Sequence, residues 1–186
     1  MNSQSNQTDK EVSRAFIDQA REYLKGDYLP KLRHCLNRLT DEQVWWRPNE
    51  ESNSIGNLLL HLSGNARQWI ATGLGGGIDG RVRQTEFDQR AIVSRKDLLQ
   101  TLEQTLTGVE DVLVRFDDRR LLETFAIQGT DVTALEAIFH VTEHFSMHTG
   151  QIILLTKLLT ASDLHFYDFE GDAPLQRWAS HSSDSS

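Results

Sequence analysis

Residues 133–159 constrain the fold of this chain more than any other stretch of its sequence. Apolar side chains recur there at helical spacing, which is typical of a helix that packs against a protein core. These positions are Leu135, Ile138, Val141, Phe145, Ile152 and Leu155. Thr133 and Glu136 have the spacing of a capping box, which predicts that the helix begins here. One face of this helix also carries histidines at intervals of four residues, which are His140, His144 and His148.

The size and composition of the chain predict one globular domain. A length of 186 residues is typical of a single domain that buries a sizeable core. Hydrophobic residues make up 38% and charged residues 25%, as in ordinary soluble proteins. The net charge of −8 disfavours nucleic acid or an anionic membrane as a partner. No apolar run reaches the roughly 18 residues that a membrane-spanning helix needs.

The amino terminus and the cysteine content favour a cytoplasmic location. The first residues, MNSQSNQTDKEV, contain no apolar segment of the kind found in secretory signals. Cys35 is the only cysteine, which excludes a disulfide within the chain. It lies within a helical pattern, and we interpret it as a small buried side chain and not as a nucleophile.

Four long segments with helical periodicity predict an all-α fold, a four-helix bundle. The segments span residues 9–39, 54–74, 94–116 and 133–159. Gly26 and Pro30 predict a kink in the first helix. The glycine-rich run 73–80 ends the second helix and opens a long connection that continues through Arg90.

The other segments are expected to be short or irregular. Residues 1–8 and 181–186 are polar and predict disordered tails on either side of a domain at 9–180. A weak pattern of apolar residues before Gly129 (Leu121, Leu122, Phe125 and Ile127) indicates a short extended segment. The aromatic segment 160–180 has no clear periodicity and is expected to wrap back over the bundle.

The histidine spacing indicates a metal site. His144 and His148 stand four residues apart, so both imidazoles can bind one ion, as in H-E-x-x-H zinc helices. A third nitrogen must come from another helix, and His61 in the second helix is the candidate. Three imidazoles favour Zn²⁺, Ni²⁺ or Fe²⁺ and leave positions for water or substrate. The alternative is a set of hydrogen-bonded core histidines, and spacing alone does not decide between the two.

The residues that carry these histidines resemble a known family. The run from His144 to Gln151, HFSMHTGQ, resembles the signature helix of the DinB/YfiT-like metalloprotein superfamily. In that superfamily the remaining ligand comes from the middle of the second helix, where this chain has His61. The run 45–48, WWRP, resembles an uncharacterised subgroup. Over residues 10–170, the resemblance implies a DinB/YfiT-like bundle whose second and fourth helices hold one divalent ion, most readily zinc or nickel, or else iron or manganese.

Polar residues near the three expected ligands are candidates for supporting roles. His140 is expected to line the pocket or to donate an outer-shell hydrogen bond, with an ordinary core histidine as the alternative. Glu143 is a candidate general base, although a solvated face would also explain it. The amides that flank the ligands suit the orientation of a ring N–H or a bound water, or simply helix packing. They are Asn57, Asn65 and Gln151.

The expected ion suggests a reaction class. An open three-histidine site lowers the pKa of bound water towards about 7 or activates a thiol. Characterised members of the superfamily include bacillithiol S-transferases and mycothiol-dependent maleylpyruvate isomerase. The resemblance therefore implies an enzyme that transfers a low-molecular-weight thiol to or from a small-molecule substrate. A hydrolase that uses metal-bound water is the first alternative, and a non-enzymatic, metal-stapled bundle is the second.

The resemblance does not determine the oligomeric state. Homodimers are common in the superfamily, so a dimer is one expectation for this chain. Trp45 and Trp46 would then seal an interface, or they would line the pocket or fill the core, and core filling is the simplest interpretation.

Overall fold

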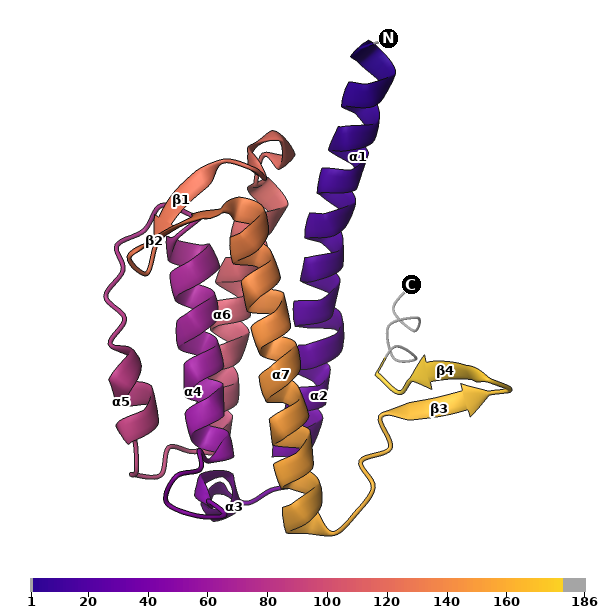
Figure 1. Ribbon diagram of the computed structural model, residues 1–186. Helices are drawn as coiled ribbons and strands as arrows, with labels where there is room; N and C mark the ends of the chain where they lie inside the picture. The colour runs from indigo at the N-terminus through magenta and orange to yellow at the C-terminus, as the bar shows by residue number, and fades with distance from the viewer. Residues whose placement is uncertain (1, 179–186) are drawn as a thin grey trace.

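Four long helices form the body of the protein in a computed structural model that describes residues 2–178 (Figure 1). Two of these helices contain π-helical stretches, and two small β-hairpins lie at the edges of the bundle. The long helices are α1 (Asn2–Arg21), continued through a π-helical stretch into α2 (Leu29–Leu36); α4 (Ile55–Ala66), continued by a π-helical stretch, Arg67–Thr72; α6 (Arg95–Arg115); and α7 (Ala134–Thr160). The all-α four-helix bundle predicted from the sequence is confirmed.

The helices begin where their capping residues predict. Thr40, Ser54 and Thr133 are the N-cap residues of α3 (Asp41–Trp45), α4 and α7, and each forms a reciprocal capping box. Ser94 caps α6 by accepting a hydrogen bond from the backbone N–H of Asp97. In α7, the carboxylate of Glu136 accepts from the backbone N–H of Thr133 at 2.7 Å, so Glu136 caps the helix.

The first helix differs from the prediction at its start and at its kink. A disordered segment was expected over residues 1–8, whereas α1 begins at Asn2. The segment lacks glycine and proline, and Gln7 donates to Glu11 one turn further on, so nothing interrupts the helix. At the expected kink, the structure has a π-helical stretch, Glu22–Tyr28, which accommodates Pro30 without ending the helix.

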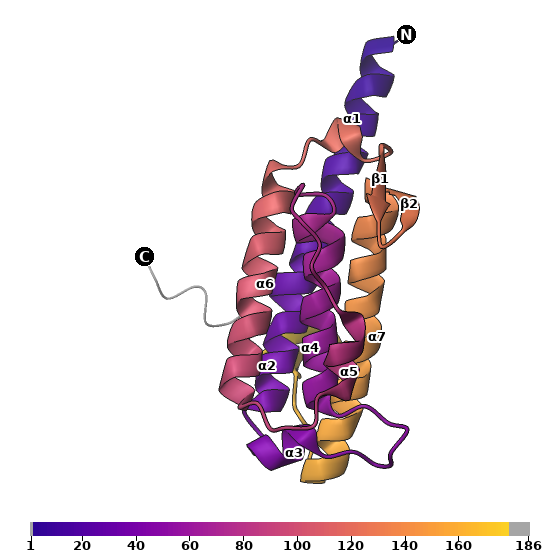
Figure 2. The ribbon, with the colours of Figure 1, turned by 90° about the vertical axis from the view of Figure 1, so that its left-hand side faces the viewer.

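The order of the helices requires a long crossover after α4. The backbone N–H of Arg95 at the start of α6 donates to Asp41 in α3, immediately before α4. Helices α4 and α6 therefore start at the same end of the bundle and run parallel. The connecting residues 73–94, called the crossover below, must return along the length of α4. The crossover contains the short helix α5 (Arg83–Asp88), which packs against α4 (Figure 2).

The hairpins occupy the segments for which the sequence has weak signals. The strands β1 (Thr124–Ile127) and β2 (Thr130–Thr133) pair antiparallel directly before α7, in agreement with the extended segment expected before Gly129. After α7, the strands β3 (Tyr167–Glu170) and β4 (Ala173–Gln176) form the second hairpin. Trp178 donates from its indole to the carbonyl of Gly26, which attaches the segment to the first helix as expected. Of the C-terminal part, residues 179–186 lie outside the described residues.

The core lies between the four helices and includes the cysteine. Cys35 is fully buried, which raises the pKa of its thiol to about 11 and agrees with a packing role. Trp45 packs over Gly56 and donates to the carbonyl of Val93, whereas Trp46 is 41% exposed and is not a core residue. Within residues 2–178, no helix is both long enough and apolar enough to cross a membrane.

Asn57 fastens the crossover to the start of α4. Its side chain is fully buried, and its amide nitrogen donates to the carbonyls of Glu86 at 2.8 Å and Gln89 at 3.2 Å. Its amide oxygen accepts from Ser54 and Arg47.

We expect Asn57→Ala to lower the free energy of unfolding by about 1–3 kcal/mol, because it leaves buried polar groups without partners. Asn49→Ala is the matched control, since Asn49 makes only an exposed hydrogen bond to Ser52 among its side-chain contacts. Urea denaturation measures both. Equal losses of stability in the two variants would contradict the anchoring role of Asn57.

Candidate metal centre

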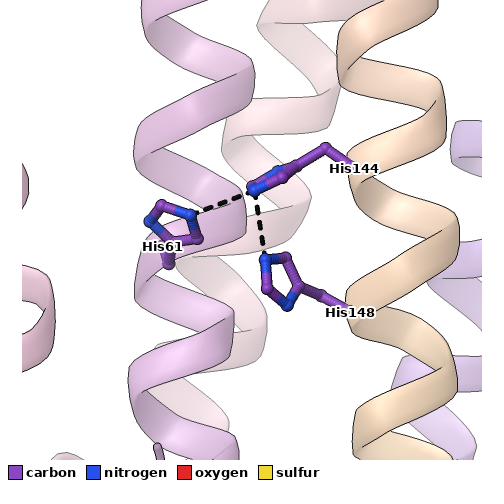
Figure 3. Close-up of side chains that lie close together, drawn as sticks. All are labelled: His61, His144 and His148. Atoms are coloured by element: carbon purple, nitrogen blue, oxygen red, sulfur yellow. Dashed lines mark hydrogen bonds between the residues drawn. The ribbon is translucent and has the colours of Figure 1, made fainter.

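Three histidine side chains meet between α4 and α7 (Figure 3). His61 comes from the middle of α4, and His144 and His148 come from successive turns of α7. Nε2 of His144 lies 3.0 Å from Nε2 of His61 and 3.1 Å from Nε2 of His148. All three residues are buried: His61 is 4% exposed, His144 7% and His148 9%. The sequence expectation that these three side chains face one another is met.

The separations of Nε2 of His144 from Nε2 of His61 and of His148 fit a shared metal ion. Two nitrogens bound to one ion at about 2.0–2.1 Å, with an angle of about 90–109° between the bonds, lie about 2.9–3.4 Å apart. The two shortest separations, 3.0 and 3.1 Å, fall within this range. One ligand nitrogen from each of the three histidines lies within 4.8 Å of the others.

The opposite ring nitrogens show which nitrogens are free to bind an ion. Nδ1 of His61 lies 2.8 Å from Glu86 Oε2, and Nδ1 of His148 lies 2.7 Å from Gln151 Oε1. An N–H must donate to each of these oxygens, so both rings carry their proton on Nδ1 and a lone pair on Nε2. Lone pairs of two rings therefore point towards the nitrogen of His144. A bound cation satisfies all three nitrogens at once.

Glu86 is a buried carboxylate that the sequence interpretation did not identify. It lies in α5, and Arg81 of the crossover binds it through two contacts: Nε to Oε1 at 2.7 Å and Nη2 to Oε2 at 2.8 Å. The side chains of Arg81 and Glu86 are 7% and 11% exposed. Burial raises the pKa of Glu86, but the hydrogen bonds from Arg81 and His61 outweigh it, and the net pKa is below the usual value. Glu86 is therefore ionised at neutral pH.

Burial keeps the rings of His144 and His148 neutral. Desolvation, followed by the nearby rings of His148 and His61, lowers the pKa of His144 to about 3. Desolvation also lowers the pKa of His148, although the hydrogen bond to Gln151 acts in the opposite direction. Neutral imidazoles are the form that binds metal, so protons compete little with an ion at neutral pH.

The other predicted site residues lie in different places. Gln151 contacts the ring of His148, as expected of an orienting amide. Asn57 instead donates a hydrogen bond to the carbonyl of Glu86 in the crossover. Nδ2 of Asn65 lies 3.1 Å from Nε2 of His140. His140 stacks against the ring of His144 at 5.5 Å between centroids and lies one turn away from the three ligand nitrogens. Glu143 is exposed to solvent, so the carboxylate that contacts the cluster is Glu86.

A cavity of about 500 Å³ adjoins the Arg81–Glu86 pair. It lies between the crossover and the helices α4 and α6, and its walls include Arg67, Arg81 and Glu86. This volume is within the range of small-molecule sites.

The depressed pKa of His144 makes stability depend on pH. Between about pH 6.5 and pH 3, the unfolded chain binds a proton on this ring that the folded chain excludes. The free energy of unfolding of the metal-free protein should therefore fall as the pH drops through this window. His144→Gln should reduce that slope by up to about 1.4 kcal/mol per pH unit. Urea denaturation between pH 6.5 and 4.5 tests this, and identical slopes would show that the ring is not held neutral.

Comparison with known proteins agrees with this fold. A protein-family model described as "Protein of unknown function (DUF1572)" matches residues 11–168. A conserved protein from Enterococcus faecalis has a similar structure, with a TM-score of 0.62 and 14% identity, over 82% of this chain and 97% of that one. A DinB-like protein from Bacillus cereus has a TM-score of 0.56 and 20% identity, over 71% of this chain and 85% of that one. No curated protein matches the sequence.

The family match covers most of the bundle, including all three histidines of the cluster. The two similar structures support the fold, and one of them is itself called DinB-like. The chain therefore belongs to the family described as "Protein of unknown function (DUF1572)".

Proposed function

We propose that this protein binds one divalent metal ion through Nε2 of His61, His144 and His148, and uses it for thiol-dependent transfer to a small-molecule substrate. The observation that carries the metal site is the meeting of three Nε2 atoms, two of which belong to rings whose opposite nitrogen faces an oxygen acceptor. Zn²⁺ or Ni²⁺ suits three imidazoles best, and Fe²⁺ or Mn²⁺ is the next choice.

The composition of the cluster supports a site that remains open to an incoming ligand. Structural zinc sites usually have four protein ligands. Among residues 2–178, the cluster of side chains whose possible ligand atoms lie close enough to share one ion consists of three histidines. The nearest further histidine, His140, contacts Asn65 and Trp69 instead, and Glu143 is exposed. Neither residue completes a closed set of four.

An ion held in this way would supply Lewis-acid activation, which lowers the pKa of a thiol so that it reacts as the thiolate. A hydrolase that uses metal-bound water is the alternative, and a general base beside the attacking water would assist it. Both oxygens of Glu86 already accept hydrogen bonds, from Arg81 and His61, so this carboxylate orients a ring and is poorly placed to remove a proton.

The substrate would bind beside the crossover, in a cavity that is lined by Glu86, the partner of His61, and by none of the three histidines. The cavity of about 500 Å³ has the size of a small-molecule site and includes the two arginines Arg67 and Arg81 in its walls. Glu86 holds Arg81 in place, whereas Arg67 donates one long hydrogen bond, 3.4 Å from its Nη2 to Oγ1 of Thr105. Arg67 is therefore the better placed of the two to contact a polar group of the substrate.

Metal content tests the proposed ligands directly. We expect the purified, untagged protein to hold close to one ion per chain, and we expect His61→Ala and His148→Ala to lose it while remaining folded. His165→Ala is the matched control, because this histidine is exposed and lies outside the cluster. Elemental analysis measures the metal content, and circular dichroism shows whether each variant remains folded. A metal-free wild type that takes up neither Zn²⁺ nor Ni²⁺ would contradict the proposal.

Removal of the ion separates an enzyme from a metal-stapled bundle. A catalytic ion should leave with a small loss of stability, whereas a structural ion should take the fold with it. Unfolding upon treatment with a chelator would favour the non-enzymatic alternative.

The thiol reaction has its own spectroscopic test. A small thiol added to the Co²⁺-substituted protein should produce a thiolate charge-transfer band, because the open position binds the sulfur. The corresponding S-methyl thioether should produce no such band. His61→Ala should abolish the band, and Cys35 should not contribute because it is buried. An unchanged spectrum at millimolar thiol and neutral pH would remove the thiol reaction from consideration.

A further inference from the structure

We propose that Glu86 is a positioning residue for the metal ligand His61, and that the Arg81–Glu86 pair makes the closed crossover and metal binding depend on each other. This inference rests on the metal site proposed above. It adds two residues from a segment that contributes no ligand, and it gives the crossover a role in metal affinity.

The hydrogen bond from His61 to Glu86 fixes the ring in the form that a metal needs. His61 can carry its proton on either nitrogen. With the proton on Nε2, the ring would donate to His144 at 3.0 Å, and the lone pair on Nδ1 would face the carboxylate of Glu86. With the proton on Nδ1, the ring donates to Glu86 and leaves Nε2 free for an ion. Glu86 therefore selects the metal-binding tautomer.

Arg81 holds Glu86 in place and also faces the ring of His61. Its guanidinium binds both oxygens of Glu86, while Nη1 donates to Gln68 of the α4 extension at 2.8 Å. Nη2 of Arg81 also lies 3.1 Å from Nδ1 of His61. In the metal-free tautomer with the proton on Nε2, Nδ1 would accept from Arg81 and lose its bond to Glu86. A bound ion removes this alternative, because it occupies Nε2.

A glycine in α4, Gly64, leaves space for the side chains of Arg81 and Glu86. Gly64 lies one turn after His61, and a Cβ atom added there would lie 2.0 Å from Oε1 of Glu86 and 2.8 Å from Nε of Arg81. A side chain at this position would push the pair away from α4. The glycine lies in the interior of a helix, where it costs about 1 kcal/mol relative to alanine. The close approach of the Arg81–Glu86 pair accounts for its presence.

Because metal binding and closure of the crossover favour the same tautomer, each must strengthen the other by the same factor. Further attachments of the crossover include the bonds from Asn57 to the carbonyls of Glu86 and Gln89, the bond from Gln68 to Asp79 and the bond from Trp45 to the carbonyl of Val93. These do not involve the cluster, so they hold the crossover near α4 when no ion is bound. Metal binding then strengthens the contact between His61 and Glu86, because it holds His61 in the tautomer that donates to this carboxylate.

The test is the Zn²⁺ dissociation constant, measured by competition with a chromophoric chelator. Glu86→Gln should weaken binding about 10–100-fold, the usual effect of an outer-shell partner of a ligand histidine. Glu110→Gln is the matched control, since Glu110 forms a similar arginine pair with Arg21 that joins α1 to α6, away from the cluster. This control should bind Zn²⁺ as the wild type does.

Gly64→Ala provides a second variant that removes no hydrogen-bonding group. Helix propensity alone would make it neutral or stabilising, yet it should weaken Zn²⁺ binding in the same direction as Glu86→Gln. Hydrogen exchange supplies a readout that a purely structural role would not move. Zn²⁺ should slow amide exchange across residues 79–89 in the wild type by about 10–100-fold, and much less in Glu86→Gln.

The outcomes separate this inference from the proposed function. Wild-type affinity in both Glu86→Gln and Gly64→Ala, or an equal loss in Glu110→Gln, would overturn the positioning role and leave the metal site standing. A second outcome would overturn the coupling to the crossover. In it, Glu86→Gln and Gly64→Ala both bind Zn²⁺ weakly, but Zn²⁺ does not change the amide hydrogen exchange of residues 79–89 in the wild type. Failure of the wild type to bind Zn²⁺ at all would overturn the proposed metal site and this inference with it.

Discussion

The contact between α4 and α7 at the three histidines is the interaction on which the other features of the site depend. Imidazole nitrogens are costly to bury without partners, and this interface buries three rings side by side. Two of the rings have an oxygen acceptor at Nδ1, from Glu86 and Gln151, which directs their Nε2 lone pairs inwards. The apolar faces of the helices place the rings together, and in the proposed function a cation would bind between them.

The parallel course of α4 and α6 determines what surrounds that contact. A chain that ends α4 at one end of the bundle must return to the other end before it starts α6, so the crossover lies along α4. Its short helix α5 places Glu86 against the ring of His61, and Arg81 and Gly64 make the close approach feasible. The connection required by the topology thus supplies the orienting carboxylate, and it forms one wall of the cavity.

Much of the fold could be predicted from the sequence, because it depends on local signals. Capping boxes at Ser54 and Thr133 mark the helix starts, and four-residue spacing places His144 beside His148. His61 could be named from its position in the second helix. The role of Glu86 could not be predicted, because it depends on how a non-periodic connection folds onto α4. The partners of Asn57 could not be predicted for the same reason, because the carbonyls of the crossover that it contacts are distant in sequence.

Anomalous diffraction from crystals of the Zn²⁺-loaded protein, recorded on both sides of the zinc absorption edge, tests the central claim most directly. The account predicts one strong zinc peak per chain about 2.0–2.1 Å from Nε2 of His61, His144 and His148. In Glu86→Gln, the peak should weaken at limiting zinc. A peak located elsewhere, or three rings joined by hydrogen bonds with no peak between them at saturating zinc, would contradict the account.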